Sequence, residues 1–462
     1  MGERSPLLVI MFSLALLTIK LEISHGSTYI RCRERERKAL IDFKLGFRDP
    51  SHLDFRSASN WFQALNALPH VREVELSGCY LGTLPRSLPY VNFTSLTRLD
   101  LGNNGFNSSI PVWLLNITSL QYLYLGNNYL SVFLPAIAKL TSLRALDLSG
   151  NLFHKGFIPT ALSNLCKLQS LLLSGTSINH SLVNLEVAFS GCLEFSLEEL
   201  DLRSTQLGGS MRADWLGNMK NLKYLYLSEN SLHGSVPDSL FNLSLLQVLD
   251  LSFNNLNGSI SEGLGQLKSL VALSLSGNSL NLSEVHLANL SSLKYLYIFY
   301  NTLILMESHD WTPPFQLTLL GMGFCQVAPR PHFPITGEVP QYLPNLIAME
   351  LSNNSFSGRL PPGIPNTMPN LRLLELSRNN LSGTVPLSIC QIKYLEILGL
   401  FQNNLAGELP SIALGFITGF WTVFGTLLLH RRWRIAYFRA ADSMYDSLCT
   451  VIVVNTARLK TK

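Results

Sequence analysis

The stretch Leu222-Lys223-Tyr224-Leu225-Tyr226-Leu227-Ser228-Glu229-Asn230-Ser231-Leu232 contains the pattern from which the rest of the chain can be interpreted. Leucine stands at its first, fourth, sixth and eleventh positions, and asparagine stands at the ninth. The same spacing returns 24 residues later, at Leu246, Leu249, Leu251, Asn254 and Leu256. The motif Leu-x-x-Leu-x-Leu-x-x-Asn-x-Leu is therefore a repeating unit.

The second apolar position of the motif marks the phase of fourteen units. Successive markers are 23 to 25 residues apart, except for two steps of 29 residues. The markers are Val74, Leu99, Leu123, Leu146, Leu171, Leu200, Leu225, Leu249, Leu273, Leu296, Leu320, Met349, Leu374 and Leu398. A fixed period of this length is typical of a leucine-rich repeat solenoid. We predict an α/β solenoid of about 14 units over residues 71–410, with a curved parallel β-sheet on its concave face.

Each part of the motif has a physical role. Leu-x-Leu predicts a short strand whose alternate side chains face in and out. One unit cannot bury its own inward leucines, so neighbouring units stack and share a core. The asparagine can bond to the backbone where the chain leaves the strand, because a buried turn needs partners for its amide groups. In four units it is replaced, by Cys79, Thr176, Thr205 and Cys325.

The N-terminus indicates a secretory route. Arg4, an apolar run at residues 7–17 and small residues near Gly26 predict a signal peptide over residues 1–26, the alternative being a membrane anchor. Residues 32–61, which precede the repeats, predict a cap for the exposed end of the solenoid. Ten Asn-x-Ser/Thr sequons predict a glycosylated ectodomain: Asn92, Asn107, Asn116, Asn179, Asn242, Asn257, Asn281, Asn289, Asn353 and Asn380.

The chain has seven cysteines, which an oxidising compartment would allow to pair. Cys166 and Cys192 flank much of the first long repeat and are the candidate disulfide. The other five have no obvious partners by spacing, so their connectivity stays open; they are Cys32, Cys79, Cys325, Cys390 and Cys449.

Residues 412–429 form a charge-free stretch of 18 residues. As a helix it would reach roughly 27 Å, close to the hydrocarbon thickness of a bilayer. Four arginines follow by residue 439, so the positive-inside rule predicts a cytoplasmic tail at residues 430–462 and a single-pass type I topology with the N-terminus outside. Gly415 and Gly419 are spaced for close approach of a second helix. The alternative is that glycine is simply common in membrane helices.

Nothing in the sequence favours catalysis, a metal, another cofactor or nucleic acid. The net charge is only +4, without a basic stripe, and the histidines lack metal-ligand spacing. Acidic residues recur between the two strand leucines, and Glu350 and Glu375 fall on adjacent units. Such a pair could resemble a glycosidase site, but one slot filled in half of the units is better explained by the repeat consensus. We therefore predict that the protein is not an enzyme.

Aromatic residues near the strands are the candidate ligand-binding side chains of the concave face: Tyr224, Tyr226, Phe253, Tyr295, Tyr297 and Phe299. Exposed tyrosine clusters are good anchors for a protein ligand. The alternative for any one of them is ordinary surface scatter.

Three stretches carry a family resemblance. They are residues 36–44, the repeats with Leu-x-Gly-x-Ile/Val-Pro, and the membrane and juxtamembrane stretch 413–438. On these the chain resembles the plant leucine-rich repeat receptor-like proteins, particularly the subgroup that includes receptors for a fungal xylanase elicitor. It would be a shortened member, because the paired-cysteine segment after Trp61 and the C-terminal cap of that family are not evident.

The resemblance implies a plasma-membrane receptor without its own kinase. Its concave face would bind an extracellular protein, peptide or glycan ligand, microbial or peptide in origin, in plant defence or, less often in this family, in development. It would signal through a membrane-anchored partner receptor kinase, recruited in part by the helix that carries Gly415 and Gly419. Two alternatives remain: an inhibitor of a wall-degrading enzyme, and a non-signalling truncated or decoy form.

Overall fold

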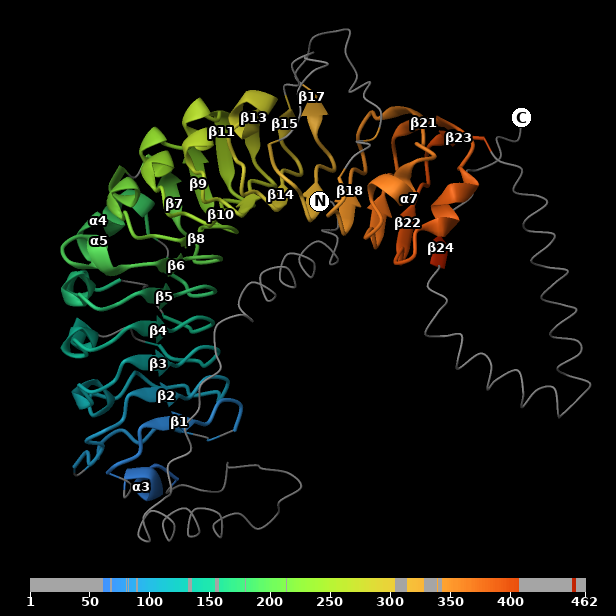
Figure 1. The fold of residues 1–462 in the computed structure, drawn as a ribbon. Helices are drawn as coiled ribbons and strands as arrows, with labels where there is room; N and C mark the ends of the chain where they lie inside the picture. Colours follow the sequence, from blue (N-terminus) through green and yellow to red (C-terminus); the bar gives the residue numbers. More distant parts are fainter. Residues whose placement is uncertain are drawn as a thin grey trace, which may run out of the picture.

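The computed structural model describes residues 61–66, 69–79, 81, 83–88, 90–131, 135–153, 158–178, 180–212, 214–303, 314–327, 339, 343–406 and 451–453. These residues form an arc with one long parallel sheet along its inner side and short helices along its outer side (Figure 1). The sequence prediction of a leucine-rich repeat solenoid is confirmed.

The long sheet has fifteen strands in the described residues, all parallel: one from each of the fourteen repeats and one from residues 451–453. Every predicted phase marker is the central residue of its strand and pairs in register with the next marker, as Leu225 does with Leu249. The strands are β1 (Glu73–Glu75), β2 (Arg98–Asp100), β3 (Tyr122–Tyr124), β4 (Ala145–Asp147), β5 (Ser170–Leu172), β6 (Glu199–Asp201), β8 (Tyr224–Tyr226), β10 (Val248–Asp250), β12 (Ala272–Ser274), β14 (Tyr295–Tyr297), β16 (Leu319–Gly321), β18 (Ala348–Glu350), β20 (Leu373–Glu375), β22 (Ile397–Gly399) and, next to β22, β24 (Val451–Val453).

Two smaller sheets lie along one edge of the arc, and the sequence did not predict them. They form because, from the sixth unit on, the segment that follows the motif asparagine or its replacement pairs with the same segment of a neighbouring unit. One contains β7 (Gly208–Ser210), β9 (Ser231–Gly234), β11 (Asn255–Ser259), β13 (Ser279–Leu282), β15 (Thr302–Leu303) and β17 (Gln326–Val327); the other contains β19 (Ser357–Arg359), β21 (Asn380–Gly383) and β23 (Asn404–Leu405).

Most helices are single turns on the convex side. Two of them directly follow Pro237 and Pro386, the prolines that end the Gly-x-Val-Pro motif of their repeats. The helices are α3 (Trp61–Asn66), η2 (Leu114–Asn116), η3 (Pro135–Lys139), η4 (Thr160–Asn164), η5 (Leu182–Leu185), α4 (Glu186–Phe189), α5 (Leu193–Ser196), η6 (Asp214–Asn218), η7 (Asp238–Asn242), η8 (Glu262–Gln266), α6 (Glu284–Leu287), α7 (Ile364–Thr367) and η9 (Leu387–Gln391).

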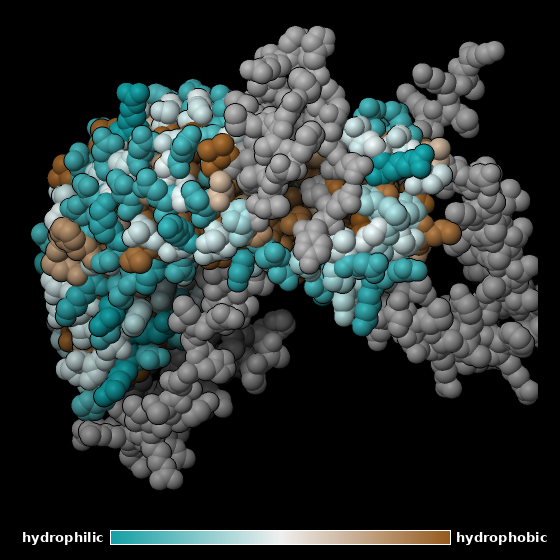
Figure 2. Space-filling model, turned by 45° about the horizontal axis from the view of Figure 1, so that its top comes forward, coloured by the Kyte–Doolittle hydropathy of each residue, from teal (hydrophilic) through white to brown (hydrophobic). Residues whose placement is uncertain are grey.

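One continuous core fills the space between the long sheet and the helices. The strand leucines are almost completely buried, as are the leucines that precede the strands. At the N-terminal end, Phe62 of α3 extends this core by packing against Trp113 at 4.2 Å and Phe93 at 5.5 Å between ring centroids. The coloured part of the face seen in Figure 2 is mainly hydrophilic with separate apolar spots, as expected when the apolar residues are shared inside.

The motif asparagines form a ladder of hydrogen bonds between units. The Asn128 amide donates to the carbonyls of Leu125 (2.9 Å) and of Leu101 in the preceding unit (3.1 Å). Its Oδ1 accepts from the N–H groups of Asn104 and Phe106, each at 3.1 Å. The predicted role of the asparagine at the turn is confirmed, and one side chain connects two units.

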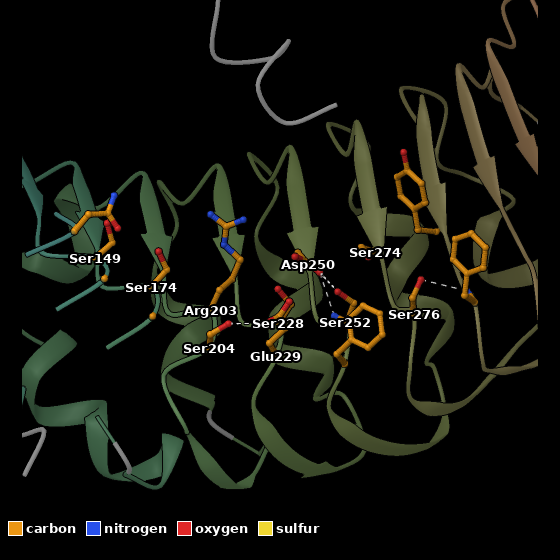
Figure 3. Close-up of a pocket in the computed structure, with 16 residues that line it drawn as sticks. Ser149, Ser174, Arg203, Ser204, Ser228, Glu229, Asp250, Ser252, Ser274 and Ser276 are labelled. Atoms are coloured by element: carbon orange, nitrogen blue, oxygen red, sulfur yellow. Dashed lines mark hydrogen bonds between the residues drawn. The ribbon is translucent and has the colours of Figure 1, made fainter. Parts of the chain in front are cut away.

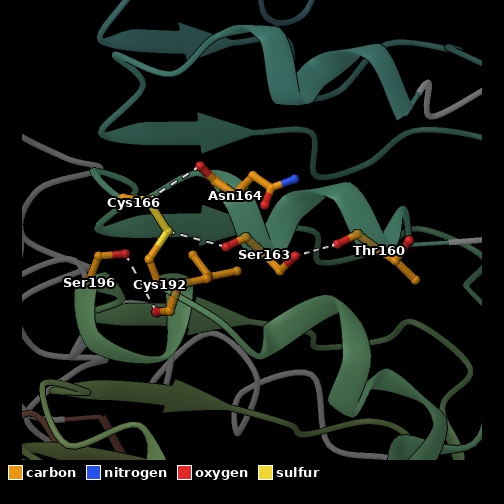
Figure 4. Close-up of a disulfide and its surroundings, with 7 residues drawn as sticks. Thr160, Ser163, Asn164, Cys166, Cys192 and Ser196 are labelled. Carbon is orange, nitrogen blue, oxygen red and sulfur yellow. Dashed lines mark hydrogen bonds between the residues drawn. A yellow bond between two sulfur atoms is a disulfide. The ribbon is translucent and has the colours of Figure 1, made fainter.

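The predicted Cys166–Cys192 disulfide is present and joins the residues after η4 to the start of α5, as Figure 4 shows. Its two cysteines are 26 residues apart in sequence, and their Cα atoms are separated by 4.9 Å. This crosslink holds together the 29-residue step between Leu171 and Leu200, where η5, α4 and α5 are inserted. Cys79, Cys325 and Cys390 are free.

Several sequence predictions lie outside the described residues. They are the signal peptide 1–26, the cap 32–61 except for Trp61, the membrane segment 412–429 with Gly415 and Gly419, and the tail 430–462 except for β24. In the part of the chain that the structure describes, no helix has the length and apolar character required to cross a bilayer.

We expect Asn128→Ala to lower the free energy of unfolding by about 3 kcal/mol, because it leaves buried backbone groups of two units without partners. The measurement is urea denaturation followed by circular dichroism. Asn184→Ala, which changes an exposed asparagine in η5, is the control and should change stability by less than about 0.5 kcal/mol. Equal effects of the two substitutions would contradict a structural role for the ladder.

We expect Cys192→Ser to lower the free energy of unfolding by about 3 kcal/mol, since it releases a closed loop of 26 residues. Cys390→Ser, at an exposed free cysteine, is the control and should leave stability nearly unchanged. Both proteins are compared with the parent by thermal melting with and without a reductant. If reductant lowers the melting temperature of Cys192→Ser as strongly as that of the parent, this disulfide is not the stabilising one.

Candidate functional site

The concave face is built from the side chains on either side of each central strand residue. In β3, β8 and β14 the sequence Tyr-Leu-Tyr places two tyrosines per strand there, with the leucine in the core. Serines occupy the position just after the next leucine in many units, for example Ser228 and Ser252. The concave face therefore carries parallel columns of polar and aromatic side chains.

The predicted aromatic patch is present on this face but is less exposed than the sequence suggested. Tyr226, Tyr297 and Phe299 are buried, whereas Tyr224, Tyr295 and Phe253 are half-buried. Aliphatic side chains of the strands between them cover these rings: Tyr226 packs with Val248 and Ala272 in a small apolar cluster outside the main core, with Tyr224 and Tyr295 against it. A ligand-binding role for these rings stays a prediction.

A cavity of about 450 Å³ lies on the concave face (Figure 3). Its lining comes from eight consecutive repeats, those of strands β3 to β14. Eight strands at roughly 4.8 Å each span about 34 Å, so the cavity is elongated. The lining residues are Asn127, Ser149, Gly150, Ser174, Gly175, Arg203, Ser204, Ser228, Glu229, Asp250, Ser252, Phe253, Ser274, Ser276, Tyr297 and Phe299.

Three residues of the predicted patch, Phe253, Tyr297 and Phe299, line this cavity, and the other three do not. The sequence analysis missed Arg203, Glu229 and the serine column, and it counted Asp250 only as a consensus acid. The serines could have been identified from the sequence, because serine recurs directly after Leu-x-Leu, as at Ser228 and Ser252.

The side chain of Arg203 is held in place by Asp201 of the same repeat. Its guanidinium donates to both carboxylate oxygens of Asp201, at 2.9 and 2.6 Å, and lies 4.8 Å from the ring centroid of Tyr226. Burial alone would lower the pKa of Arg203, but the hydrogen bonds and charge of Asp201 raise it above its ordinary value. The positive charge is thus permanent and is paired with Asp201.

Asp250 is buried, with 1% of its surface exposed. Its Oδ1 accepts from the backbone N–H and the hydroxyl of Ser252, at 3.1 and 2.6 Å. Its Oδ2 has no hydrogen-bond partner among the described residues. Burial raises the pKa of the Asp250 carboxyl, and Ser252, Ser228 and Arg203 offset only part of that effect.

The acids between the strand leucines have a common structural role. Six of the seven accept the N–H two residues further on, as Glu350 does from Ser352 and Glu375 does from Ser377, both at 3.0 Å, whereas Glu75 pairs with Arg98. Glu350 and Glu375 pair directly across β18 and β20, which confirms that they are neighbours. Burial, with a smaller contribution from Glu375, raises the pKa of Glu350 to about 7. This repeated bond is the physical basis of the acidic consensus.

The predicted glycosylation sites are accessible where the structure describes them. Six of the asparagines are exposed and three, Asn92, Asn281 and Asn353, are half-buried, while Asn179 lies outside the described residues. Glycan occupancy stays a prediction. Among the described residues no group of three or more His, Cys, Asp and Glu side chains is arranged to hold a metal ion.

Family comparison matches residues 94–153 and 195–256 to a family described as Leucine rich repeat. Residues 142–165, 345–367 and 370–392 match a second family of the same description.

Two curated relatives come from Solanum lycopersicum. Receptor-like protein EIX2 is 32% identical over 435 residues, which cover 78% of this chain and 40% of the relative. Receptor-like protein EIX1 is 35% identical over 393 residues, which cover 67% of this chain and 38% of the relative. The chain therefore spans about 40% of the length of these relatives.

Solved plant receptors share the fold. The plant peptide hormone receptor RGFR1 in complex with RGF2 matches with a TM-score of 0.54 and 27% identity, covering 74% of this chain and 60% of that one. The Arabidopsis receptor kinase HAESA, in complex with the peptide hormone IDA and the co-receptor SERK1, matches with a TM-score of 0.58 and 23% identity, covering 81% and 70%.

The fold and the family matches together define a leucine-rich repeat protein. Within that class, the chain is a plant leucine-rich repeat receptor-like protein related to EIX1 and EIX2 of tomato. These homologues are receptor-like proteins and not enzymes.

The raised pKa of Glu350 predicts a pH-dependent stability. Because the pKa is about 7 in the folded protein and 4.5 without burial, the folded state binds more protons between these values. Stability should therefore decrease as the pH rises from 4.5 to 7, by about 1–3 kcal/mol from this residue. Glu350→Gln should unfold at a higher urea concentration than the parent at pH 8 and at a similar one at pH 4.5. The exposed Glu73→Gln is the control, and a constant effect of Glu350→Gln at both pH values would contradict the assignment.

Proposed function

We propose that this protein is a cell-surface receptor-like protein whose concave face binds an extracellular peptide or protein ligand. The observation that carries the proposal is the elongated cavity, which crosses eight repeats and combines aromatic rings, hydroxyls and charges. An extended chain can follow such a cavity and contact one or two residues from each repeat. A compact small molecule would leave most of it empty.

The relatives support the same assignment. Both tomato relatives are receptor-like proteins. RGFR1 and HAESA, which share the solenoid, were solved with peptide hormones bound, and the HAESA complex also contains the co-receptor SERK1. By analogy, the protein signals in plant defence through a partner receptor kinase. The solenoid lies outside the plasma membrane, residues 412–429 cross it as one helix, and residues 430–462 lie in the cytoplasm.

This topology can be tested with a C-terminal epitope tag on the full-length chain expressed in plant cells. We expect the tag to be detected only after permeabilisation, and an antibody to the repeats to label intact cells. The pairing of β24 with β22 would instead require residues 451–453 on the same side of the membrane as the repeats. Tag labelling on intact cells would therefore overturn the proposed topology.

The same cells provide a second readout. Sequons that pass through the secretory route should carry glycans, and those at the cell surface should resist endoglycosidase. A chain without residues 1–26 is the matched control and should remain unglycosylated. A full-length chain that is wholly endoglycosidase-sensitive and intracellular would contradict a receptor function at the surface.

A further inference from the structure

The C-terminal end of the solenoid exposes positions that belong to the core elsewhere. Strands β22 and β23 lie at this end of the arc (Figure 1). Val385 is 41% exposed, whereas Val236, which precedes a proline in the same way in an inner unit, is 5% exposed. Ile397, the first residue of β22, is 42% exposed, whereas Val248, the first residue of β10, is 1% exposed. Inner units are covered by the unit that follows, and the part of the chain that the structure describes contains no repeat beyond the one that ends at residue 406.

Leu387 adds an apolar side chain at a place where inner units have a charge. It is the first residue of η9 and is 83% exposed. The helices η6, η7 and η8 begin with an acidic residue instead, Asp214, Asp238 and Glu262. The last complete unit and the strand after it therefore expose three aliphatic side chains, of Val385, Leu387 and Ile397, that inner units bury or replace.

The same two units carry aromatic and basic side chains in contact with one another. Lys393 Nζ lies 5.0 Å from the ring centroid of Tyr394, which is exposed. Arg378 Cζ lies 5.5 Å from the ring centroid of Phe401. Within the described residues neither base has a salt bridge. Tyrosine and the long basic residues favour the boundary between lipid hydrocarbon and headgroups, because each has an apolar body and a polar end.

The length of the chain decides what lies beside this end. The last described residue of the solenoid is Ala406, and the segment that we propose crosses the membrane begins at Ile412. Six residues of fully extended chain reach at most about 22 Å. The exposed end of the solenoid is therefore held within reach of the bilayer surface.

We propose that the C-terminal end of the solenoid docks on the lipid bilayer. Val385, Leu387 and Ile397 enter the headgroup layer, and Lys393 donates hydrogen bonds to lipid phosphates. Lipid then provides the cover that the terminal unit of a solenoid needs. The assignment rests on the proposed function, because it requires the membrane segment 412–429. In that topology residues 451–453 lie across the membrane, so the edge of β22 that they cover in the structure faces the bilayer as well.

The test uses the full-length protein in phosphatidylcholine nanodiscs, with a fluorophore on the thiol of Cys390. This thiol is exposed and lies in η9, three residues after Leu387. Cys32, Cys79 and Cys449 are changed to serine, and Cys325 is buried. We expect phosphatidylcholine with a nitroxide on its headgroup to lower the emission at least about twofold, because the fluorophore then lies among the headgroups.

The same fluorophore on Cys79 is the positional control, with Cys390 changed to serine in place of Cys79. Cys79 follows β1, which lies thirteen strands from β22 in the long sheet, so its emission should not change. Equal quenching at the two positions would overturn docking by the C-terminal end.

Leu387→Asp separates docking from simple attachment through residues 407–411. The substitution gives η9 the kind of first residue that η6 and η7 have, so the fold is kept, and it should restore at least about half of the lost emission from Cys390. Val112→Asp is the matched control, because Val112 is exposed and directly follows a proline, as Leu387 does; it should leave the quenching unchanged. Unchanged quenching in Leu387→Asp would overturn the inference.

A further variant tests the chain itself as the alternative occupant. Ile452→Asp disrupts the strand that pairs with β22, and it should leave the quenching as in the parent. Quenching that appears only in Ile452→Asp would show that residues 451–453 cover the end, and the docking inference would be wrong. The surface-labelling experiment reports the topology independently: the expected topology without quenching overturns only this inference, whereas a C-terminal tag outside intact cells overturns both proposals.

Discussion

The rest of the structure depends on how the backbone N–H and C=O groups of the buried turn after each strand find hydrogen-bond partners. In every unit the residue before the motif asparagine has a φ between 51° and 69°, in the left-handed region. This bend turns the chain towards the convex side and exposes carbonyls and N–H groups to the core. The asparagine amide bonds to them and to the preceding unit at the same time, so the turn and the stacking are one interaction. Where threonine replaces asparagine, as at Thr205, the hydroxyl still donates to the carbonyl three residues earlier.

The same constraint shapes the candidate site. Glycine would adopt the left-handed backbone without strain, but only four units have glycine there. Phe253 and Glu229 occupy this strained position beside the cavity, at φ values of 51° and 56°. Their side chains project from a backbone that the asparagine ladder holds fixed. Ten units hold a non-glycine residue in this conformation, so the strain belongs to the turn of the repeat and is not confined to the cavity.

The sequence predicted the strand positions because the leucine period is imposed by the shared core. All fourteen phase markers are strand centres, and the disulfide followed from the long step that its cysteines flank. The second row of sheets was not predictable from apolar periodicity, since strands such as β11 (Asn255–Ser259) contain one buried leucine and otherwise exposed residues. They form through pairing between units, which a single unit does not encode. For the site, the sequence located the aromatic side chains but not their burial, because that depends on packing against other units, as Tyr226 packs against Val248 and Ala272.

Asp147 and Asp250 show most clearly where sequence reasoning stops. Both occur in the sequence Leu-Asp-Leu-Ser, and both bind the serine two residues later. One is half-buried, whereas the other is buried beside Arg203 and lines the cavity. The neighbouring strands differ: Asp250 pairs in register with Tyr226 of β8 and Ser274 of β12, whereas Asp147 pairs with Tyr124 of β3 and Leu172 of β5. A repeat protein can therefore keep one local motif throughout and create a distinct site by changing only the side chains of adjacent units. The buried oxygen of Asp250 that lacks a hydrogen-bond partner among the described residues is then a local cost that the shared leucine core tolerates.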